Sequence, residues 1–246
     1  MKTRILLSAA AVSVGLCSCC TQQPWQVADS VEIPPPATSV TRQEVLLTAR
    51  KYISLKWNAQ QRHSLHGKDP NGQWVDTPDA AAQNTLGSAM WWQIGPNVGM
   101  PYKWGGFDTP VQFLQRLEQD PVVYAGDYAS EAKIAGGDDA VSEYAAGVDC
   151  SGFVSRCWRL PRPYSTRQLG ALCTQLPSFD DLKPGDIALL PGVHVILFEG
   201  WANAAHTALY AIEAGGNPHW KCYRYHVRVE TLRKLGYKPW RYNNIR

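Results

Sequence analysis

The chain has 246 residues, of which 45% are apolar, enough for one large domain or two small ones with a sizeable core. Its formal net charge is +3, with 24 basic against 21 acidic residues. This near balance gives no electrostatic reason to expect a nucleic acid as partner, or a membrane bound by charge alone. Ten Trp and eleven Tyr favour a groove lined by rings, although most are expected to fill the core.

The first residues have the pattern of a targeting segment. Lys2 and Arg4 precede an apolar stretch, 5–16, which is too short to span a bilayer as a helix. We expect residues 1–18 to be a signal peptide that is removed from the mature protein. Their removal takes away two basic residues and lowers the net charge from +3 to +1.

The sequence Leu-Cys-Ser-Cys-Cys at 16–20 resembles the cleavage box of bacterial lipoproteins. Cys19 fits the lipid-bearing position best, because a leucine lies three residues before it and a serine directly before it, whereas Cys17 and Cys20 fit less well. We therefore expect an extracytoplasmic protein that the lipid on Cys19 anchors to the membrane of the bacterial cell envelope. An ordinary secretory signal that ends in cysteines is the alternative.

Residues 19–40 contain three consecutive prolines and few apolar anchors, which predicts a tether before a domain over 41–246. Thr41 to Glu44 form a capping-box pattern, and helically spaced apolar residues predict a helix over 41–57. Residues 58–83 are expected to be irregular. A short helix carrying two tryptophans is predicted over 86–94.

The middle of the chain is predicted to alternate between short helices and loops. Thr109 is expected to cap one helix, and residues 120–147, rich in Asp, Gly and Ala, to be mostly loop. A helix is predicted over 150–158, and another short one over 165–172.

The hydrophobic period then changes to that of strands, predicted over 187–190, 193–199, 208–214, 223–229 and 240–245. Helices followed by a run of short strands predict an α+β fold with an antiparallel sheet.

Cys150 is the candidate nucleophile. It lies in the sequence Asp-Cys-Ser-Gly-Phe-Val, which is typical of a first helical turn, and both a helix start and a neighbouring imidazolium favour the reactive thiolate. His194 begins an apolar strand pattern and is the candidate base. A histidine in such a strand can also be a hydrogen-bonded core residue, so the pairing with Cys150 carries the functional interpretation.

The base needs a partner that orients its ring, and Glu213 in the next predicted strand is the candidate. If the two strands pair antiparallel across residues 200–207, Glu213 lies near His194, and a carboxylate among Ala and Ile is costly to bury unpaired. His206 is the alternative orienter, and a solvated carboxylate on an edge strand is the alternative interpretation of Glu213.

Beside the thiol, the start of the helix and the backbone N–H of Cys150 can stabilise an oxyanion. Asp149 and Ser151 flank Cys150, and each can cap the helix or bind a polar group of a substrate. A disulfide between Cys173 and Cys222 is possible in an oxidising compartment, but nothing in the sequence requires it. Outside the N-terminal cysteine cluster, no CxxC or HxxxH spacing indicates a metal site, and we expect no metal and no other cofactor.

Five sequence blocks occur in a fixed order along residues 100–214. They are Tyr-Lys-Trp-Gly-Gly at 102–106, Asp-Cys-Ser-Gly-Phe-Val at 149–154, Leu-Pro-Arg at 160–162 with Gln168 and Gly170, Pro-Gly-Asp at 184–186, and His-Val at 194–195. Together they resemble the NlpC-type cell-wall peptidases, which belong to the papain-like cysteine peptidases.

The resemblance implies a papain-like fold, with N-terminal helices packed on a small antiparallel β-sheet. It implies a cysteine endopeptidase that hydrolyses amide bonds in peptidoglycan stem peptides, commonly the bond between the γ-carboxyl of D-glutamate and a diamino acid. Cys150 matches the nucleophile, His194 the base, and Tyr102 the tyrosine beside the nucleophile. Asp149 and Ser151 match residues that hold the free amine of the stem peptide in some members. Trp104, in the same block as Tyr102, is a further candidate for substrate binding.

The chain departs from the family pattern in three places. Glu213 stands where the third polar residue is usually His, although a carboxylate can also orient an imidazole. The segment 107–147 is longer than usual, and residues 41–98 match no accessory domain, so both are expected to be enlargements of the catalytic domain. Two other functions stay open: a wall- or partner-binding protein on a degenerate peptidase scaffold, and an amidase or acyltransferase that uses the same Cys–His pair.

Overall fold

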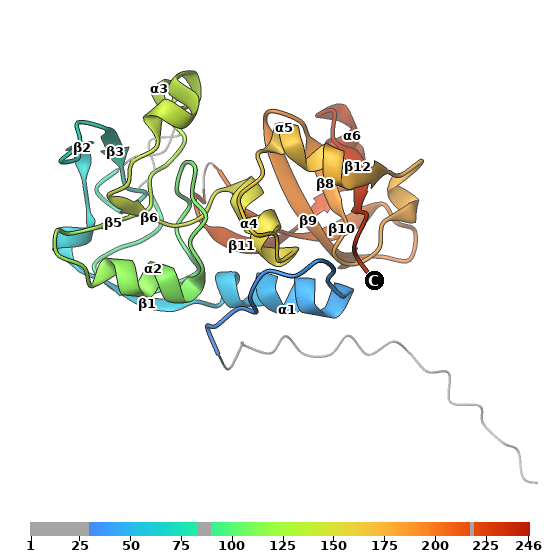
Figure 1. The fold of residues 1–246 in the computed structure, drawn as a ribbon. Helices are drawn as coiled ribbons and strands as arrows, with labels where there is room; N and C mark the ends of the chain where they lie inside the picture. Colours follow the sequence, from blue (N-terminus) through green and yellow to red (C-terminus); the bar gives the residue numbers. More distant parts are fainter. Residues whose placement is uncertain (1–29, 83–89, 217–218) are drawn as a thin grey trace, which may run out of the picture.

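The computed structural model describes residues 30–82, 90–216 and 219–246 (Figure 1). The predicted signal peptide and the predicted lipid-bearing Cys19 lie outside these ranges. Among the described residues, no helix combines the length and the apolar character that a membrane crossing requires.

The structure is of the α+β class, as the sequence predicts. Its helices are α1 (Arg42–Ile53), α2 (Pro110–Leu117), α3 (Glu131–Gly136), α4 (Cys150–Cys157), α5 (Thr166–Leu169) and α6 (Val229–Lys234), with single 3₁₀ turns η1 (Gln61–His63), η2 (Gly137–Ala140), η3 (Gly170–Leu172) and η4 (Phe179–Asp181). Its strands are β1 (Lys56–Ala59), β2 (His66–Lys68), β3 (Trp74–Asp76), β4 (Gly95–Val98), β5 (Tyr124–Ala125), β6 (Ala145–Ala146), β7 (Cys173–Gln175), β8 (Ile187–Leu190), β9 (His194–Trp201), β10 (Ala208–Ala214), β11 (Cys222–Arg228) and β12 (Lys238–Tyr242).

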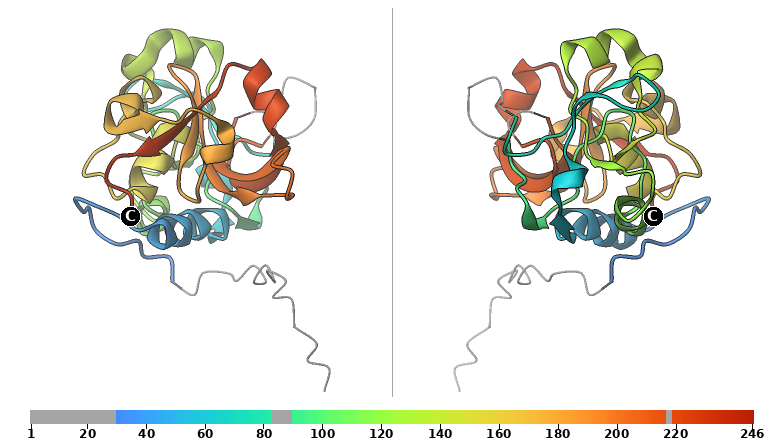
Figure 2. Two further views of the ribbon diagram at one scale, coloured as in Figure 1. Left: turned by 90° about the vertical axis from the view of Figure 1, so that its right-hand side faces the viewer. Right: turned by 90° about the vertical axis from the view of Figure 1, so that its left-hand side faces the viewer.

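Six strands form one antiparallel sheet in the order β11-β10-β9-β8-β12-β7. Three two-stranded ladders, β1-β4, β2-β3 and β5-β6, belong to the N-terminal part. Figure 1 shows α4 between these small ladders and the six-stranded sheet, with α1 running below α4 and the sheet. The side view in Figure 2 shows α1 along the same lower edge, and α1 packs directly on α4.

Successive side chains of β8 and β9 point alternately to the two faces of the sheet, and both faces are packed. In β8 and β9, Leu189 and Leu197 belong to the core that includes Phe153 of α4. Their neighbours in sequence, Ala188 and Ile196, belong to a second core, which α6 covers. Since successive side chains of a strand point to opposite faces, one apolar run supplies both cores. The apolar strands predicted over 187–190 and 193–199 are thus buried on both sides.

Several of the predicted elements differ from the observed ones. The predicted helix over 41–57 begins with its capping box at Thr41 but ends at Ile53, because the following residues pair as β1 with β4. The helix predicted over 86–94 is wrong for its described part: residues 90–94 are not helical, and Trp92 bridges Asp79 instead. Its other residues, 86–89, lie outside the described ranges. The irregular segment 58–83 contains a short hairpin, β2-β3.

The segment 30–40 lies against the domain, so the described part of the predicted tether is not free. The backbone of Ala37 donates to Arg159, and the Arg159 guanidinium donates to the carbonyl of Pro35 (3.0 and 2.7 Å). Val40 pairs in parallel with Ile245 and exchanges backbone hydrogen bonds with the neighbouring C-terminal residues. The beginning and the end of the domain therefore lie side by side.

The enlarged segment 107–147 is folded onto the N-terminal part, and its residues 120–147, predicted to be mostly loop, contain β5, α3, η2 and β6. Its parallel pair β5-β6 lies in the same region as α2, and α3 carries a buried cation, Lys133, whose Nζ lies 2.6 Å from Asp127 Oδ2. Burial raises the pKa of Asp127 to about 6, although Lys133 opposes the shift. A buried pair of this kind fixes the position of α3, because separating its members would leave a charge without a partner.

Candidate functional site

The candidate nucleophile begins helix α4. Asp149 is its N-cap, and the carboxylate accepts hydrogen bonds from the Gly152 backbone N–H (2.6 Å) and from the Ser151 hydroxyl (2.9 Å). Cys150 is the first residue of the helix and is only 7% exposed. The sequence thus places the thiol at the positive end of the helix, where backbone N–H groups point outward.

Two of the sequence blocks that carry the family resemblance pack directly on each other. The Gly106 carbonyl accepts from the backbone N–H of Asp149 (3.2 Å), and Arg156 lies 3.5 Å above the ring of Phe107. A Cβ at Gly152 would lie 2.1 Å from the Gly106 carbonyl oxygen. This close approach explains why the third residue of the Cys-Ser-Gly block has no side chain.

Gly152→Ala is therefore expected to destabilise the fold by about 3 kcal/mol, because a rigid backbone carbonyl must move. The opposing gain in helix propensity is only about 0.5–1 kcal/mol. The effect is measured by urea unfolding of Gly152→Ala and of a matched control, Gly200→Ala. A Cβ at Gly200 meets nothing within 4 Å, so the control should unfold like the wild type. Equal unfolding midpoints for the two variants would contradict the packing described.

His194 and Glu213 meet across neighbouring strands. His194 is the first residue of β9, and its Nε2 lies 2.9 Å from Glu213 Oε2. Ile212 pairs with Leu197, so Glu213 and His194 are diagonal neighbours on one face of the antiparallel pair. This confirms the expected contact, and β10 is an inner strand, so Glu213 is a buried carboxylate (5% exposed) rather than a solvated edge residue.

The charges of the site support one another. Burial lowers the pKa of His194, but the charge and hydrogen bond of Cys150 and those of Glu213 together raise it well above its usual value. Burial raises the pKa of Glu213, but His194 and two phenol donors lower it below its usual value. Both shifts favour an imidazolium beside a carboxylate, with Cys150 near the imidazolium. Such an arrangement can activate a thiol and then return a proton to a leaving group.

Two tyrosines that the sequence analysis did not single out complete the surroundings of Glu213. Tyr223 donates to Oε1 (2.8 Å) and Tyr225 donates to Oε2 (2.9 Å), both from β11. The only sequence signal was the alternating strand pattern that contains them, and it does not reveal which residues they oppose on β10.

Tyr102 lies near Cys150 and packs against further aromatic rings. Tyr102 is buried, and burial together with the nearby Cys150 and Asp149 raises the pKa of its phenol well above the usual value. Its ring makes an edge contact with Trp220 (5.2 Å between centroids), and Trp220 packs on Tyr128 (5.4 Å). The structure therefore brings the predicted Tyr102 to the thiol and adds two rings that the sequence did not indicate.

The other candidates are distributed as follows. Asp149 and Ser151 adjoin the thiol, and both take part in capping α4. The indole of Trp104 donates to the carbonyl of Gly137 (2.9 Å), so it packs against the enlarged segment. His206, the alternative orienter, stacks on Trp201 (4.0 Å) and lies 3.4 Å from Asp180, so it is engaged elsewhere.

Cys150, Cys157, Cys173 and Cys222 are all free thiols, so the disulfide left open between Cys173 and Cys222 is not formed. Burial raises the pKa of Cys173 to about 12 and those of Cys157 and Cys222 well above the usual value. These three are poor nucleophiles, since the thiolate is the reactive form. Within the described ranges, no group of three His, Cys, Asp or Glu side chains could hold a metal ion.

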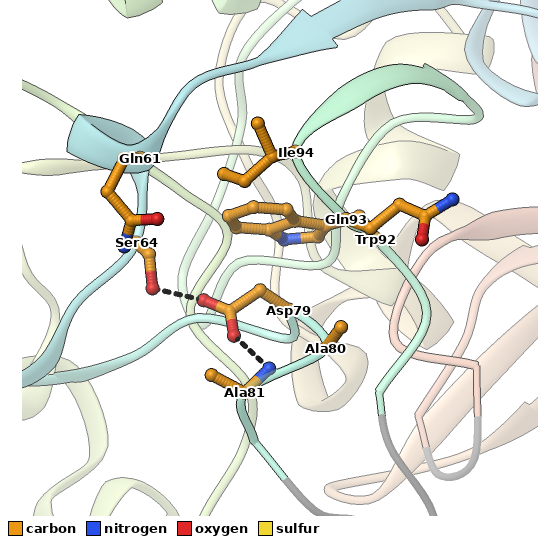
Figure 3. Close-up of a pocket in the computed structure, with 8 residues that line it drawn as sticks. All are labelled: Gln61, Ser64, Asp79, Ala80, Ala81, Trp92, Gln93 and Ile94. Atoms are coloured by element: carbon orange, nitrogen blue, oxygen red, sulfur yellow. Dashed lines mark hydrogen bonds between the residues drawn. The ribbon is translucent and has the colours of Figure 1, made fainter.

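A cavity of about 210 Å³ lies in the N-terminal part of the chain, and none of the predicted site residues lines it (Figure 3). Its lining residues are Gln61, Ser64, Asp79, Ala80, Ala81, Trp92, Gln93 and Ile94. Asp79 already accepts from the hydroxyls of Ser64 and Thr77 and from the Ala81 backbone. The carboxylate is thus satisfied from within the protein, and the cavity has no part in the chemistry considered below.

Comparison of the chain with protein-family models, with curated proteins and with solved structures gives no match in any of the three. The resemblance to the NlpC-type peptidases therefore depends on the sequence blocks alone, and the chemistry of the site depends on the contacts of Cys150, His194 and Glu213.

Proposed function

We propose that this protein is a cysteine endopeptidase with a papain-like architecture, which hydrolyses amide bonds in peptidoglycan stem peptides. The observation that carries the proposal is the contact of His194 Nε2 with Glu213 Oε2 at 2.9 Å, on an imidazole whose pKa the nearby Cys150 raises. A nucleophile, a base and an orienter in contact are the minimum constellation for thiol-dependent acyl transfer.

In the proposed first step, the Cys150 sulfur attacks the carbonyl carbon of the substrate amide, and the thiol proton resides on His194. The oxyanion that forms is stabilised by the N–H groups at the start of α4. His194 then donates its proton to the leaving amine, the C–N bond breaks, and a thioester on Cys150 remains. Water attacks the thioester with His194 as base, which releases the acid and restores the thiol.

The surroundings of Cys150 suit a stem peptide. Tyr102 supplies an aromatic ring near the thiol and packs on Trp220, and Asp149 supplies a carboxylate and Ser151 a hydroxyl next to the thiol. A carboxylate in that place favours a substrate that carries a free amine, as the family resemblance implies. The bond between the γ-carboxyl of D-glutamate and a diamino acid is accordingly the proposed site of cleavage.

We propose further that the protein acts outside the cytoplasm, held at the membrane by a lipid on Cys19. The basic and apolar residues 1–16 and the cysteine-containing box that follows support this address. Docking of residues 30–40 on the domain leaves residues 19–29 as the link between Cys19 and the described structure.

The function is tested by incubating the purified chain with a synthetic stem peptide that contains the γ-D-glutamyl bond and analysing the products by mass spectrometry. The matched substrate has the same residues joined through the α-carboxyl, and the matched protein is alkylated at Cys150. Cleavage of the γ-linked peptide alone, lost on alkylation, is expected. Release of a different amine would indicate an amidase, transfer to an added amine would indicate an acyltransferase, and tight binding without turnover would indicate a binding protein.

A further inference from the structure

Glu213 is a buried carboxylate that is held by three hydrogen-bond donors from two strands. His194 and Tyr225 both bind Oε2 at 2.9 Å, and Tyr223 binds Oε1 at 2.8 Å. Each oxygen therefore has a phenol donor, and one oxygen is shared with the imidazole. A carboxylate that is 5% exposed needs such donors, because an unpaired charge in the interior is costly.

The register of the sheet creates this arrangement. Tyr223 pairs directly with Glu213, and Tyr225 pairs with Ala211, two residues away on the same face. The two phenol rings stack at 5.0 Å between centroids, which limits their movement. A Cβ at Gly215 would lie 2.3 Å from Glu213 Oε1 and 2.4 Å from Tyr223 Cε1, so the cluster is closely packed around this glycine.

A buried ionised carboxylate needs more hydrogen-bond donors around it than a neutral imidazole does in the same position. It can hold the ring of His194 only while it keeps its charge and its orientation, and burial opposes the charge. We infer that Tyr223 and Tyr225 are positioning residues, whose phenol groups keep the Glu213 carboxylate ionised and turned toward His194. The inference deepens the proposed function and rests on it.

The phenols are suited to this role because they stay protonated. Burial and the neighbouring Glu213 charge raise the pKa of both tyrosines far above the usual value, so each remains a hydrogen-bond donor at neutral pH. Hydrogen bonds to a charged group are the stronger ones. Removing either phenol should therefore raise the pKa of Glu213, since a donor that stabilises its anion is lost.

The test measures Glu213 directly in the full chain. Glutamate carboxyl groups are labelled with ¹³C, the Glu213 resonance is assigned by its loss in Glu213→Gln, and its pKa is determined by NMR in Tyr223→Phe, Tyr225→Phe and the double variant. We expect a rise in each single variant and a rise of about one pH unit in the double variant. The pH below which iodoacetamide alkylation of Cys150 slows should move upward with it.

Tyr210→Phe is the matched control, because Tyr210 lies on β10 but packs under Arg224 rather than on Glu213. It should move neither the titration nor the alkylation profile. A purely structural role for the tyrosines would lower the unfolding midpoint and leave the Glu213 titration unchanged, and that outcome overturns the inference. If the double variant does not fold, the single variants decide, since each keeps one donor. Neither readout uses a stem peptide, so failure of the proposed substrate is detected separately.

Discussion

Cys150→Ala is expected to reduce hydrolysis of the γ-linked stem peptide by at least about 10⁴-fold, because no other group in the proposed mechanism can form the thioester. The fold should be retained: Cys150 is a small side chain at a helix start, and alanine keeps the backbone of α4 unchanged. Product formation over a long incubation, followed by mass spectrometry, measures the loss.

The matched control is Cys173→Ala. Cys173 is a free thiol whose pKa burial raises to about 12, so its removal should leave the hydrolysis rate unchanged. Undiminished turnover by Cys150→Ala would show that the thiol at the start of α4 is not the nucleophile, and the proposed mechanism would be abandoned.

His194→Ala is expected to reduce hydrolysis by about 10²–10⁴-fold, the usual contribution of a positioned proton-transfer group. The substitution also leaves the buried Glu213 carboxylate without the imidazole that it hydrogen-bonds. The variant should therefore be less stable as well as less active, so rates are compared below its own unfolding temperature. His206→Ala is the control, because that imidazole stacks on Trp201 and does not contact Glu213.

The pH dependence expected of the wild-type protein follows from the same pair. The pKa of Glu213 is lowered, so its negative charge persists as the pH falls below the usual glutamate value. The pKa of His194 is raised, so its positive charge persists as the pH rises above the usual histidine value of about 6.5. Hydrolysis that needs this ion pair should stay high across neutral pH and fall on the alkaline side only above that value. If the hydrolysis rate falls to half near pH 6.5 as the pH is raised, the pKa of His194 is not raised, and the proposed ion pair with Glu213 is contradicted.

Local signals in the sequence predicted the elements that local interactions form. Thr41 and Asp149 both cap helices as their side chains suggested, since a cap is made by residues within one turn. The prediction of a helix around Trp92 was wrong because distant contacts determine the structure of that segment. Trp92 is buried against Trp57 and bridges Asp79, contacts that lie far apart in the sequence and outweigh helix propensity.

The site was predictable to the extent that its residues share a hairpin. Glu213 was expected near His194 because a short loop joins their strands, and an antiparallel pairing follows from such a loop. The connection between β10 and β11, residues 215–221, is about as long as the loop 202–207, and a connection of this length does not by itself fix the register of the pairing. A slip of one residue would turn Tyr223 and Tyr225 to the other face, so their role could only be seen in the structure.

The pairing of Val40 with Ile245 has a consequence for how the molecule can be rebuilt. Because the two ends of the domain adjoin, a short linker could join them, and new ends could be opened in the exposed turn at 70–72 of the β2-β3 hairpin. Such a circular permutant would keep every strand pair of the six-stranded sheet and every contact of Cys150. The order of elements along the chain would change, while the geometry of Cys150, His194 and Glu213 would be the same.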